Sequence, residues 1–103
     1  MRQAHILLHN KIAGILTETN HNKAYRFEYS IEYTGNPVSL TMPIKDKTFE
    51  FDKFPPFLEG LLPEGPMLES LLTRKKFDRN DRLSQIIQVG NDLVGAITVK
   101  RKK

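Results

Sequence analysis

Two histidines stand four residues apart near the start of the chain, a spacing that on one face of a helix would form a metal-binding pair. His5 and His9 lie instead in a run of β-prone residues. Because a strand advances about 3.3 Å per residue, their side chains would be roughly 13 Å apart, too far to share one ion. We therefore expect ordinary strand and turn residues here and no bound metal.

Two pairs of glycines have the spacing of a phosphate-binding loop, Gly60–Gly65 and Gly90–Gly95. Such a loop needs a lysine and then a serine or threonine directly after its second glycine, to contact the phosphates and the magnesium ion. Pro66-Met67 follows the first pair and Ala96-Ile97 the second. The glycine spacings therefore do not predict nucleotide binding, and we expect no cofactor.

The remaining candidates for chemistry are three carboxylates, Asp78, Asp81 and Asp92, none of which has a histidine nearby in the sequence. Asp92 is better explained as a loop residue that bonds local backbone N–H groups, with a catalytic carboxylate as the alternative. The glycine loop, strand lysine, catalytic aspartate and metal ligands that phosphoryl transfer requires are also missing. We expect a protein that is not an enzyme.

The stretch from Phe54 to Met67 organises the elements around these residues, since it holds four of the six prolines. Prolines suit the first turn of a helix, so the sequence predicts one helix from about Pro55 to Leu62 and a second from about Pro66 to Lys76. Between them Pro63 breaks the first helix, and Gly65 can adopt a positive φ. Both helices should press apolar stripes onto a sheet; the leucines expected in the core are Leu58, Leu61, Leu62, Leu68, Leu71 and Leu72.

Strand signals fill the rest of the chain. The strongest is the strict alternation from Tyr25 to Tyr33, and a hairpin is expected around Asn10, which can adopt a left-handed turn conformation. A third helix, capped by Asn80, should end near Gly90. The fold class is therefore α+β, a small antiparallel sheet of about five strands packed against two or three short helices. The candidate strands are Ala4–Leu8, Ile12–Thr19, Tyr25–Tyr33, Val38–Met42, Thr48–Phe51 and Val94–Lys100.

Length and composition limit what this fold can do. The 103 residues suffice for one domain, residues 1–103, with one core. The absence of cysteine excludes disulfides and thiolate chemistry, and no apolar run has the length of a signal peptide core or a membrane span, so we expect a cytoplasmic protein. Residues 1–69 hold 7 Lys or Arg and 9 Asp or Glu, whereas residues 70–103 hold 9 and 3. The basic character belongs to the C-terminal third, including a tail at about residues 100–103.

Several motifs together resemble one family. They are Ala13-Gly14-x-Leu16, Phe27-x-Tyr29, Ser39-Leu40-Thr41-Met42-Pro43, Phe57-x-x-x-Leu61-Leu62-Pro63-Glu64-Gly65 and Ile87-x-x-Gly90-x-Asp92-x-x-Gly95-Ala96. In this order they resemble the N-terminal subdomain of the HipA-type serine/threonine kinase toxins. A complete kinase of that type is several times longer, so the chain looks like a HipS-type antitoxin from a tripartite HipB, HipS and HipT system. The resemblance implies binding and inhibition of a HipT-type kinase that lacks this subdomain.

The Pro-Glu-Gly-Pro link is the expected contact with that kinase, because its backbone groups cannot all be paired internally and must lie at the surface. The candidate partner-binding residues are Phe57, Glu64, Gly65, Pro66 and Met67. Family members often carry a large aromatic residue just after the Glu-Gly pair, where this chain has Pro66 and then Met67.

Two other functions are compatible with the sequence. The basic residues Arg74, Lys75, Lys76, Arg101 and Lys102 could touch DNA phosphates, weakly or indirectly, beside a HipB-like DNA-binding protein. The alternative for these residues is an ordinary solvated surface, with Lys75 and Lys76 favourably placed at a helix C-terminus. The chain could also be a structural subdomain that completes the kinase fold without inhibiting it.

Overall fold

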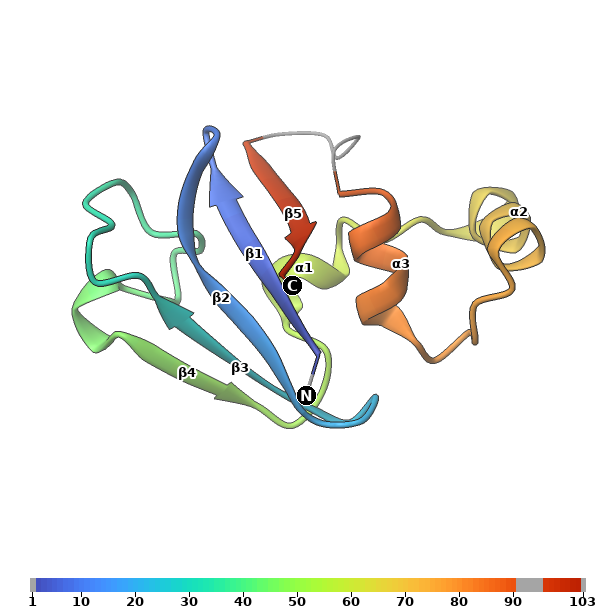
Figure 1. Ribbon diagram of the computed structural model, residues 1–103, viewed down its shortest axis with the longest axis horizontal. Coiled ribbons are helices and arrows are strands. Elements are labelled where there is room, and N and C mark those ends of the chain that lie inside the picture. The colour runs from blue at the N-terminus through green and yellow to red at the C-terminus, as the bar shows by residue number, and fades with distance from the viewer. Residues whose placement is uncertain (1, 91–95, 103) are drawn as a thin grey trace.

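A five-stranded antiparallel sheet with the strand order β4-β3-β2-β1-β5 forms one layer of the molecule, and helices lie behind it (Figure 1). The computed structural model describes residues 2–90 and 96–102. The predicted α+β class is confirmed. In chain order the described elements are β1 (Gln3–Leu8), β2 (Lys11–Asn20), β3 (Ala24–Tyr29), the 3-10 helix η1 (Ile44–Asp46), β4 (Thr48–Phe51), α1 (Pro56–Glu59), α2 (Gly65–Lys75), α3 (Arg82–Gln88) and β5 (Ile97–Arg101).

The predicted hairpin joins β1 to β2. Its turn places His9 at φ 51° and Asn10 at φ 67°, the left-handed conformation that asparagine tolerates better than most residues. The last strand returns to the sheet as predicted, because β5 pairs with β1 and sets Val99 opposite Ile6. Val94, where we expected this strand to begin, lies outside the described residues.

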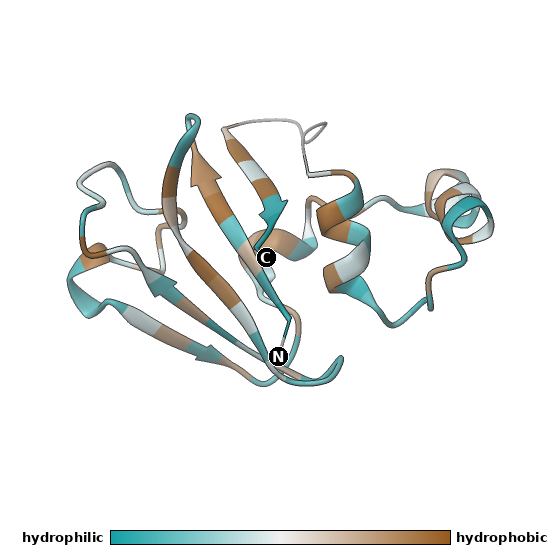
Figure 2. Cartoon of the chain, in the orientation of Figure 1, coloured by the Kyte–Doolittle hydropathy of each residue, from teal (hydrophilic) through white to brown (hydrophobic). Residues whose placement is uncertain are grey.

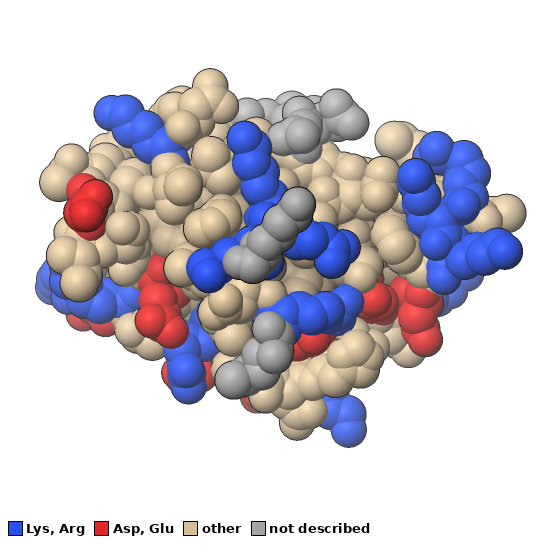
Figure 3. Space-filling model, viewed as in Figure 1, with Lys and Arg blue, Asp and Glu red and all other residues tan. Residues whose placement is uncertain are grey.

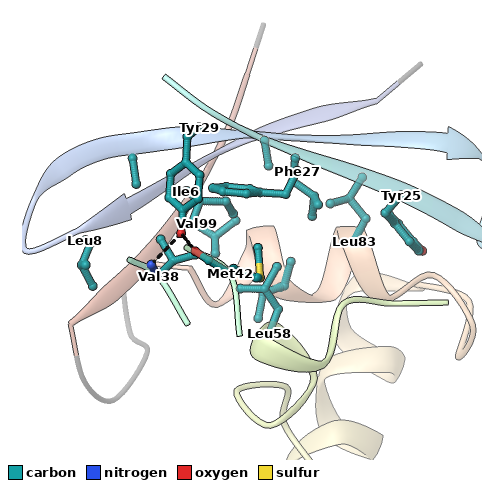
Figure 4. Packing of buried hydrophobic residues seen from close by; sticks show 14 of the residues in the cluster. Ile6, Leu8, Tyr25, Phe27, Tyr29, Val38, Met42, Leu58, Leu83 and Val99 are labelled. Carbon is teal, nitrogen blue, oxygen red and sulfur yellow. Dashed lines mark hydrogen bonds between the residues drawn. The ribbon is translucent and has the colours of Figure 1, made fainter. Parts of the chain in front are cut away.

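Alternation along β3 explains why the core lies on one side of the sheet. Tyr25, Phe27 and Tyr29 are buried at 5% exposure or less. Their neighbours Arg26 and Glu28 point to the opposite face, since successive side chains in a strand alternate. Figure 4 shows the buried residues of the strands meeting those of the helices and the β3–β4 loop on this one side. Figure 2 shows the hydrophobic residues concentrated along β1, β2 and α3.

The strand predicted from Tyr25 to Tyr33 is wrong beyond Tyr29. The N–H of Ser30 still donates to the carbonyl of Ala13 (2.8 Å), but the chain then turns away from the sheet. Tyr33 nevertheless reaches the core, because the turn stacks its ring on that of Tyr29 with centroids 6.1 Å apart. The alternation in the sequence therefore extends past the strand end but the burial does not, since Ile31 is 90% exposed and only the turn brings Tyr33 back to the core.

The strand predicted from Val38 to Met42 is also wrong. These residues form bends and turns inside the β3–β4 loop, although Val38 and Met42 are buried as an inward strand face would be. The hydroxyl of Tyr29 bonds both of them, accepting from the Val38 N–H and donating to the Met42 carbonyl. This side-chain hydroxyl satisfies backbone groups that a neighbouring strand would otherwise have paired.

Contrary to our expectation, the two helices predicted around the proline-rich stretch do not both pack on the sheet. The helix predicted from Pro55 to Leu62 is shorter as α1, which places Leu58 in the core, with Leu61 and Leu62 packed half-buried against it. The second helix, α2, forms as predicted, but it lies beyond α3 and away from the sheet (Figure 1). Our expectation that α2 adds core residues is confirmed for Leu71 alone, which is 3% exposed. Leu71 is buried and Leu68 and Leu72 half-buried, outside the central cluster.

Asp81, and not Asn80 as predicted, caps α3. Its carboxylate accepts from the N–H of Ser84 (3.2 Å) and from the Ser84 hydroxyl (2.8 Å). Gly90 follows the end of α3 as predicted. A Cβ at this position would lie 1.9 Å from the Val99 carbonyl oxygen, so glycine allows the helix end to meet β5.

Asp81 also belongs to an ion cluster that joins the chain start to α3. The Arg2 guanidinium makes two hydrogen bonds to Glu18 (2.7 and 2.8 Å) and two to Asp81 (2.9 and 3.1 Å). Burial alone would raise the pKa of Glu18, but the bonds from Arg2 and from the Asn22 N–H outweigh it, so its pKa lies below the usual value. Burial alone would also raise the pKa of Asp81. The hydrogen bonds from Arg2 and Ser84 outweigh this effect, so the pKa of Asp81 likewise lies below its usual value.

The close approach of β2 to β3 gives a first prediction. A Cβ at Gly14 would lie 2.2 Å from the Glu28 carbonyl oxygen and 2.8 Å from the Phe27 ring, whereas at Gly60 it would meet nothing within 4 Å. Gly14→Ala should lower the free energy of unfolding by about 1–3 kcal/mol through overpacking. Gly60→Ala, at φ −67°, should be neutral or stabilise by about 0.4–1 kcal/mol. Urea denaturation measures both, and equal losses would refute the account.

The ion cluster gives a second prediction, a pH dependence. The carboxylates of Glu18 and Asp81 both have lowered pKa values in the folded state. Their contribution to the free energy of unfolding is therefore complete above their unfolded pKa values of about 4, and it is lost as the pH falls through their folded pKa values. Arg2→Met should cost about 2–4 kcal/mol at pH 7, toward the lower end of the range for breaking a buried pair, because Arg2 is 34% exposed.

The loss caused by Arg2→Met should shrink below about pH 4, where the uncompensated carboxylates become protonated. Urea unfolding at pH 7 and pH 3 tests this. Arg26→Met is the matched control, since its ion pair with Glu50 is exposed on both sides, and it should change stability little at either pH. A loss for Arg2→Met that is as large at pH 3 as at pH 7 would contradict the assignment.

Candidate partner-binding site

The link between α1 and α2 has a defined backbone. Glu64 is extended (φ −133°, ψ 162°) and its carbonyl accepts from the Leu68 N–H (3.4 Å), while Gly65 takes a positive φ of 57°. No atom lies within 4 Å of where a Cβ on Gly65 would be, so the backbone conformation alone demands glycine there. Pro66, in the first turn of α2, fixes the next φ. The predicted break between the two helices is therefore a link with a defined backbone conformation that leads into α2.

Four of the five predicted partner-binding residues lie together at this break and face solvent. Glu64, Gly65 and Pro66 are exposed, and Met67 is 73% exposed, which rules out the core position that its apolar side chain would also have suited. Within the described part of the chain Glu64 takes part in no salt bridge. The structure thus brings a carboxylate and a large apolar side chain to one projecting turn.

Phe57, the fifth candidate, is not part of this turn. It is half-buried on α1 and packs at the edge of the core, with its ring 5.7 Å from Phe27 and 6.4 Å from Phe51. Any partner would reach only its exposed edge. Its clearest role in the structure is to hold α1 against β3 and β4.

The predicted basic contacts divide into two separate groups. Arg74 and Lys75 end α2 and Lys76 follows it, all three exposed, whereas Arg101 ends β5 and Lys102 donates its N–H to the Gln3 carbonyl (3.1 Å). Figure 3 shows blue side chains over α2 and, apart from them, around the two chain ends. The fold does not gather the five residues into one basic surface.

The described parts of the chain hold no cluster of side chains with the makeup of a metal site. Residues 2–90 and 96–102 contain no group of three or more histidines, aspartates or glutamates that could hold a metal ion. Asp81 is engaged by Arg2 and Ser84, while Asp92 lies outside the described residues. The same ranges hold no helix long and apolar enough to cross a bilayer.

The surface of the described residues includes open depressions of about 320 and 460 Å³, and the lining of these two includes no residue of the α1–α2 link. Sequence reasoning did not anticipate the Arg2 cluster, nor an exposed leucine in the β3–β4 loop, Leu40. The role of Arg2 could not be predicted, since nothing in the sequence indicates that it pairs with Asp81, 79 residues away. The exposure of Leu40 was not predicted because the sequence around it indicated a strand.

The comparisons with known proteins cover almost the whole chain. It is 25% identical to a solved structure described as the N-terminal domain of HipA toxin, with a TM-score of 0.76 over 100% of this chain and 94% of that one. An uncharacterized protein of Haemophilus influenzae is 26% identical over 103 residues, covering 100% of this chain and 95% of the relative. The family profile described as HipA N-terminal domain matches residues 4–100. The chain belongs to the HipA N-terminal domain family.

Proposed function

We propose that this protein is a non-catalytic antitoxin subunit that binds and inhibits a HipT-type serine/threonine kinase. The observation that carries the proposal is the projecting turn Glu64–Met67, on a domain of the HipA N-terminal family. Burying an exposed methionine contributes about 1.5–3 kcal/mol to binding. The fixed backbone around Gly65 and Pro66 lowers the entropy lost when that side chain is ordered.

The proposed mechanism is steric. The kinase would bind this domain where a full-length toxin carries its own N-terminal subdomain, alongside the N-terminal lobe and near the nucleotide cleft. From there the Glu64–Met67 turn would enter the cleft and oppose the closure that phosphoryl transfer needs. The antitoxin would act in the cytoplasm, with a HipB-like DNA-binding protein in the same complex and only weak or indirect contact of its own with DNA.

The distribution of charge favours this proposal over a DNA-contacting role. Tight binding to duplex DNA requires several cations placed along one face. Here Arg74–Lys76 and Arg101–Lys102 lie on different elements, with α3 between them in Figure 1. A purely structural subdomain would bind the kinase through the same turn but leave it active, so a kinase assay separates the two roles.

The third prediction addresses the turn directly. Met67→Asp combined with Glu64→Lys should weaken binding to the kinase about 100-fold and restore its toxicity in co-expression, because the variant removes an apolar anchor and reverses a charge. Both side chains are exposed, so circular dichroism should show an unchanged fold. Isothermal titration calorimetry and growth curves provide the readouts.

The matched control for this prediction is Arg101→Glu with Lys102→Glu, which changes two charges at the other end of the chain. It should leave kinase binding and neutralisation within about twofold, since exposed rim charges contribute little affinity. If the turn variant still neutralises the kinase fully while the tail variant fails, the contact lies at the basic chain end and the proposal is wrong.

A further inference from the structure

The β3–β4 loop covers part of the core, and two of its residues, Val38 and Met42, are buried and held in place. Val38 is 8% and Met42 3% exposed, and Figure 4 shows both beneath the sheet, with Met42 beside Leu58 of α1. The loop therefore belongs to the same layer as α1, on the side of the sheet that the helices cover. Whatever this loop presents outward lies on the outside of that layer.

A buried hydroxyl fixes both residues. Tyr29, itself 5% exposed, accepts a hydrogen bond from the Val38 N–H (3.0 Å) and donates one to the Met42 carbonyl (2.5 Å). Burial raises the pKa of this hydroxyl, so it keeps the proton that it donates. Between the fixed residues, the Met42 N–H donates to the Ser39 carbonyl (3.1 Å) and the Ser39 hydroxyl bonds that of Thr41 (3.1 Å). The three intervening residues are held as a turn.

This turn exposes the whole side chain of a leucine. Leu40, midway between two buried residues, has a relative exposure of 103%, so its side chain contacts almost nothing in the folded chain. Single exposed aliphatic residues are common on protein surfaces. Leu40 differs in being held at the top of a turn whose two ends are pinned, so little backbone conformational entropy remains to be lost when it is buried.

The surroundings of Leu40 indicate what kind of surface it fits. Residues 33–44 contain no charged side chain, in a chain whose residues are 27% charged. Phosphates of a nucleic acid or of an anionic membrane attract Lys and Arg, which this run lacks. The buried centre of a protein interface is, by contrast, depleted of charge and built around a few apolar anchors. An uncharged apolar socket on a protein is the matching partner surface.

We propose that Leu40 is a second anchor for the same kinase, inserting into an apolar socket while the Glu64–Met67 turn makes the first contact. The inference rests on the proposed function. The loop and α1 form a single layer on one side of the sheet, and α1 leads along the chain into the Glu64–Met67 turn. Two anchors so placed would fix the orientation of the domain on the kinase, which one projecting turn cannot do.

The test is a titration of the full chain with a purified HipT-type kinase, using Leu40→Ala and the matched variant Ile12→Ala. Ile12 is 50% exposed, pairs with Leu7 and lines a depression beside the first residues of the β3–β4 loop, so its truncation removes a similar side chain near that loop but outside the Leu40 turn. Leu40→Ala should weaken the Kd about tenfold or more, and Ile12→Ala less than about twofold. Both variants should fold normally, because neither side chain is buried.

The outcomes separate this inference from the function on which it rests. If the kinase binds the wild-type chain, the Glu64 and Met67 variant loses binding and Leu40→Ala stays within about twofold, the second anchor is refuted while the antitoxin proposal stands. If the wild-type chain does not bind the kinase at all, both are refuted. If light scattering shows a wild-type dimer that Leu40→Ala dissociates without changing kinase affinity, the occupant is a second copy and the inference is wrong.

Discussion

One constraint shapes the described part of the molecule: its helices and its β3–β4 loop cover the same face of the five-stranded sheet. The rings of Tyr25, Phe27 and Tyr29 all need cover on that face, and the covering layer is assembled from short pieces, α1, α3 and the β3–β4 loop. These pieces fill the layer. The remaining helix, α2, extends beyond α3 and away from the sheet, and the residues at its start, 64–67, are exposed.

The same constraint explains how polar groups hold the layer in place. The covering pieces are too short to satisfy their own backbone groups, so side chains do so instead: the Tyr29 hydroxyl bonds Val38 and Met42 of the β3–β4 loop, and the Asp81 carboxylate bonds the Ser84 N–H in α3. Arg2 in turn ties Asp81 at the start of α3 to Glu18 on β2. Fixing the layer in this way also fixes what it presents outward, namely Leu40 on one segment and Met67 on another.

The fold class, the hairpin, the returning strand and the break before α2 could be predicted from sequence, because each follows from local chemistry such as alternation or proline placement. The structure of the β3–β4 loop and the cap of α3 depend instead on tertiary contacts. Val38 and Met42 alternate like strand residues, yet the hydroxyl of Tyr29 binds them as a loop. Asp81 replaces Asn80 as the cap because Arg2 holds its carboxylate there. Of the candidate site, the exposed turn was predictable from its prolines and glycine, whereas Leu40 was not, since exposure depends on what the rest of the fold leaves uncovered.

In the proposed complex, the outer side of the helix layer and the first turn of α2 form the surface that meets the kinase. Hydrogen–deuterium exchange of the full chain, with and without the purified kinase, tests this most directly. We predict slower exchange in the complex for backbone amides in residues 64–70 and 38–42, and unchanged exchange at the basic chain end, residues 97–102. Protection confined to residues 97–102 or to the open face of β2 and β3 would contradict the account.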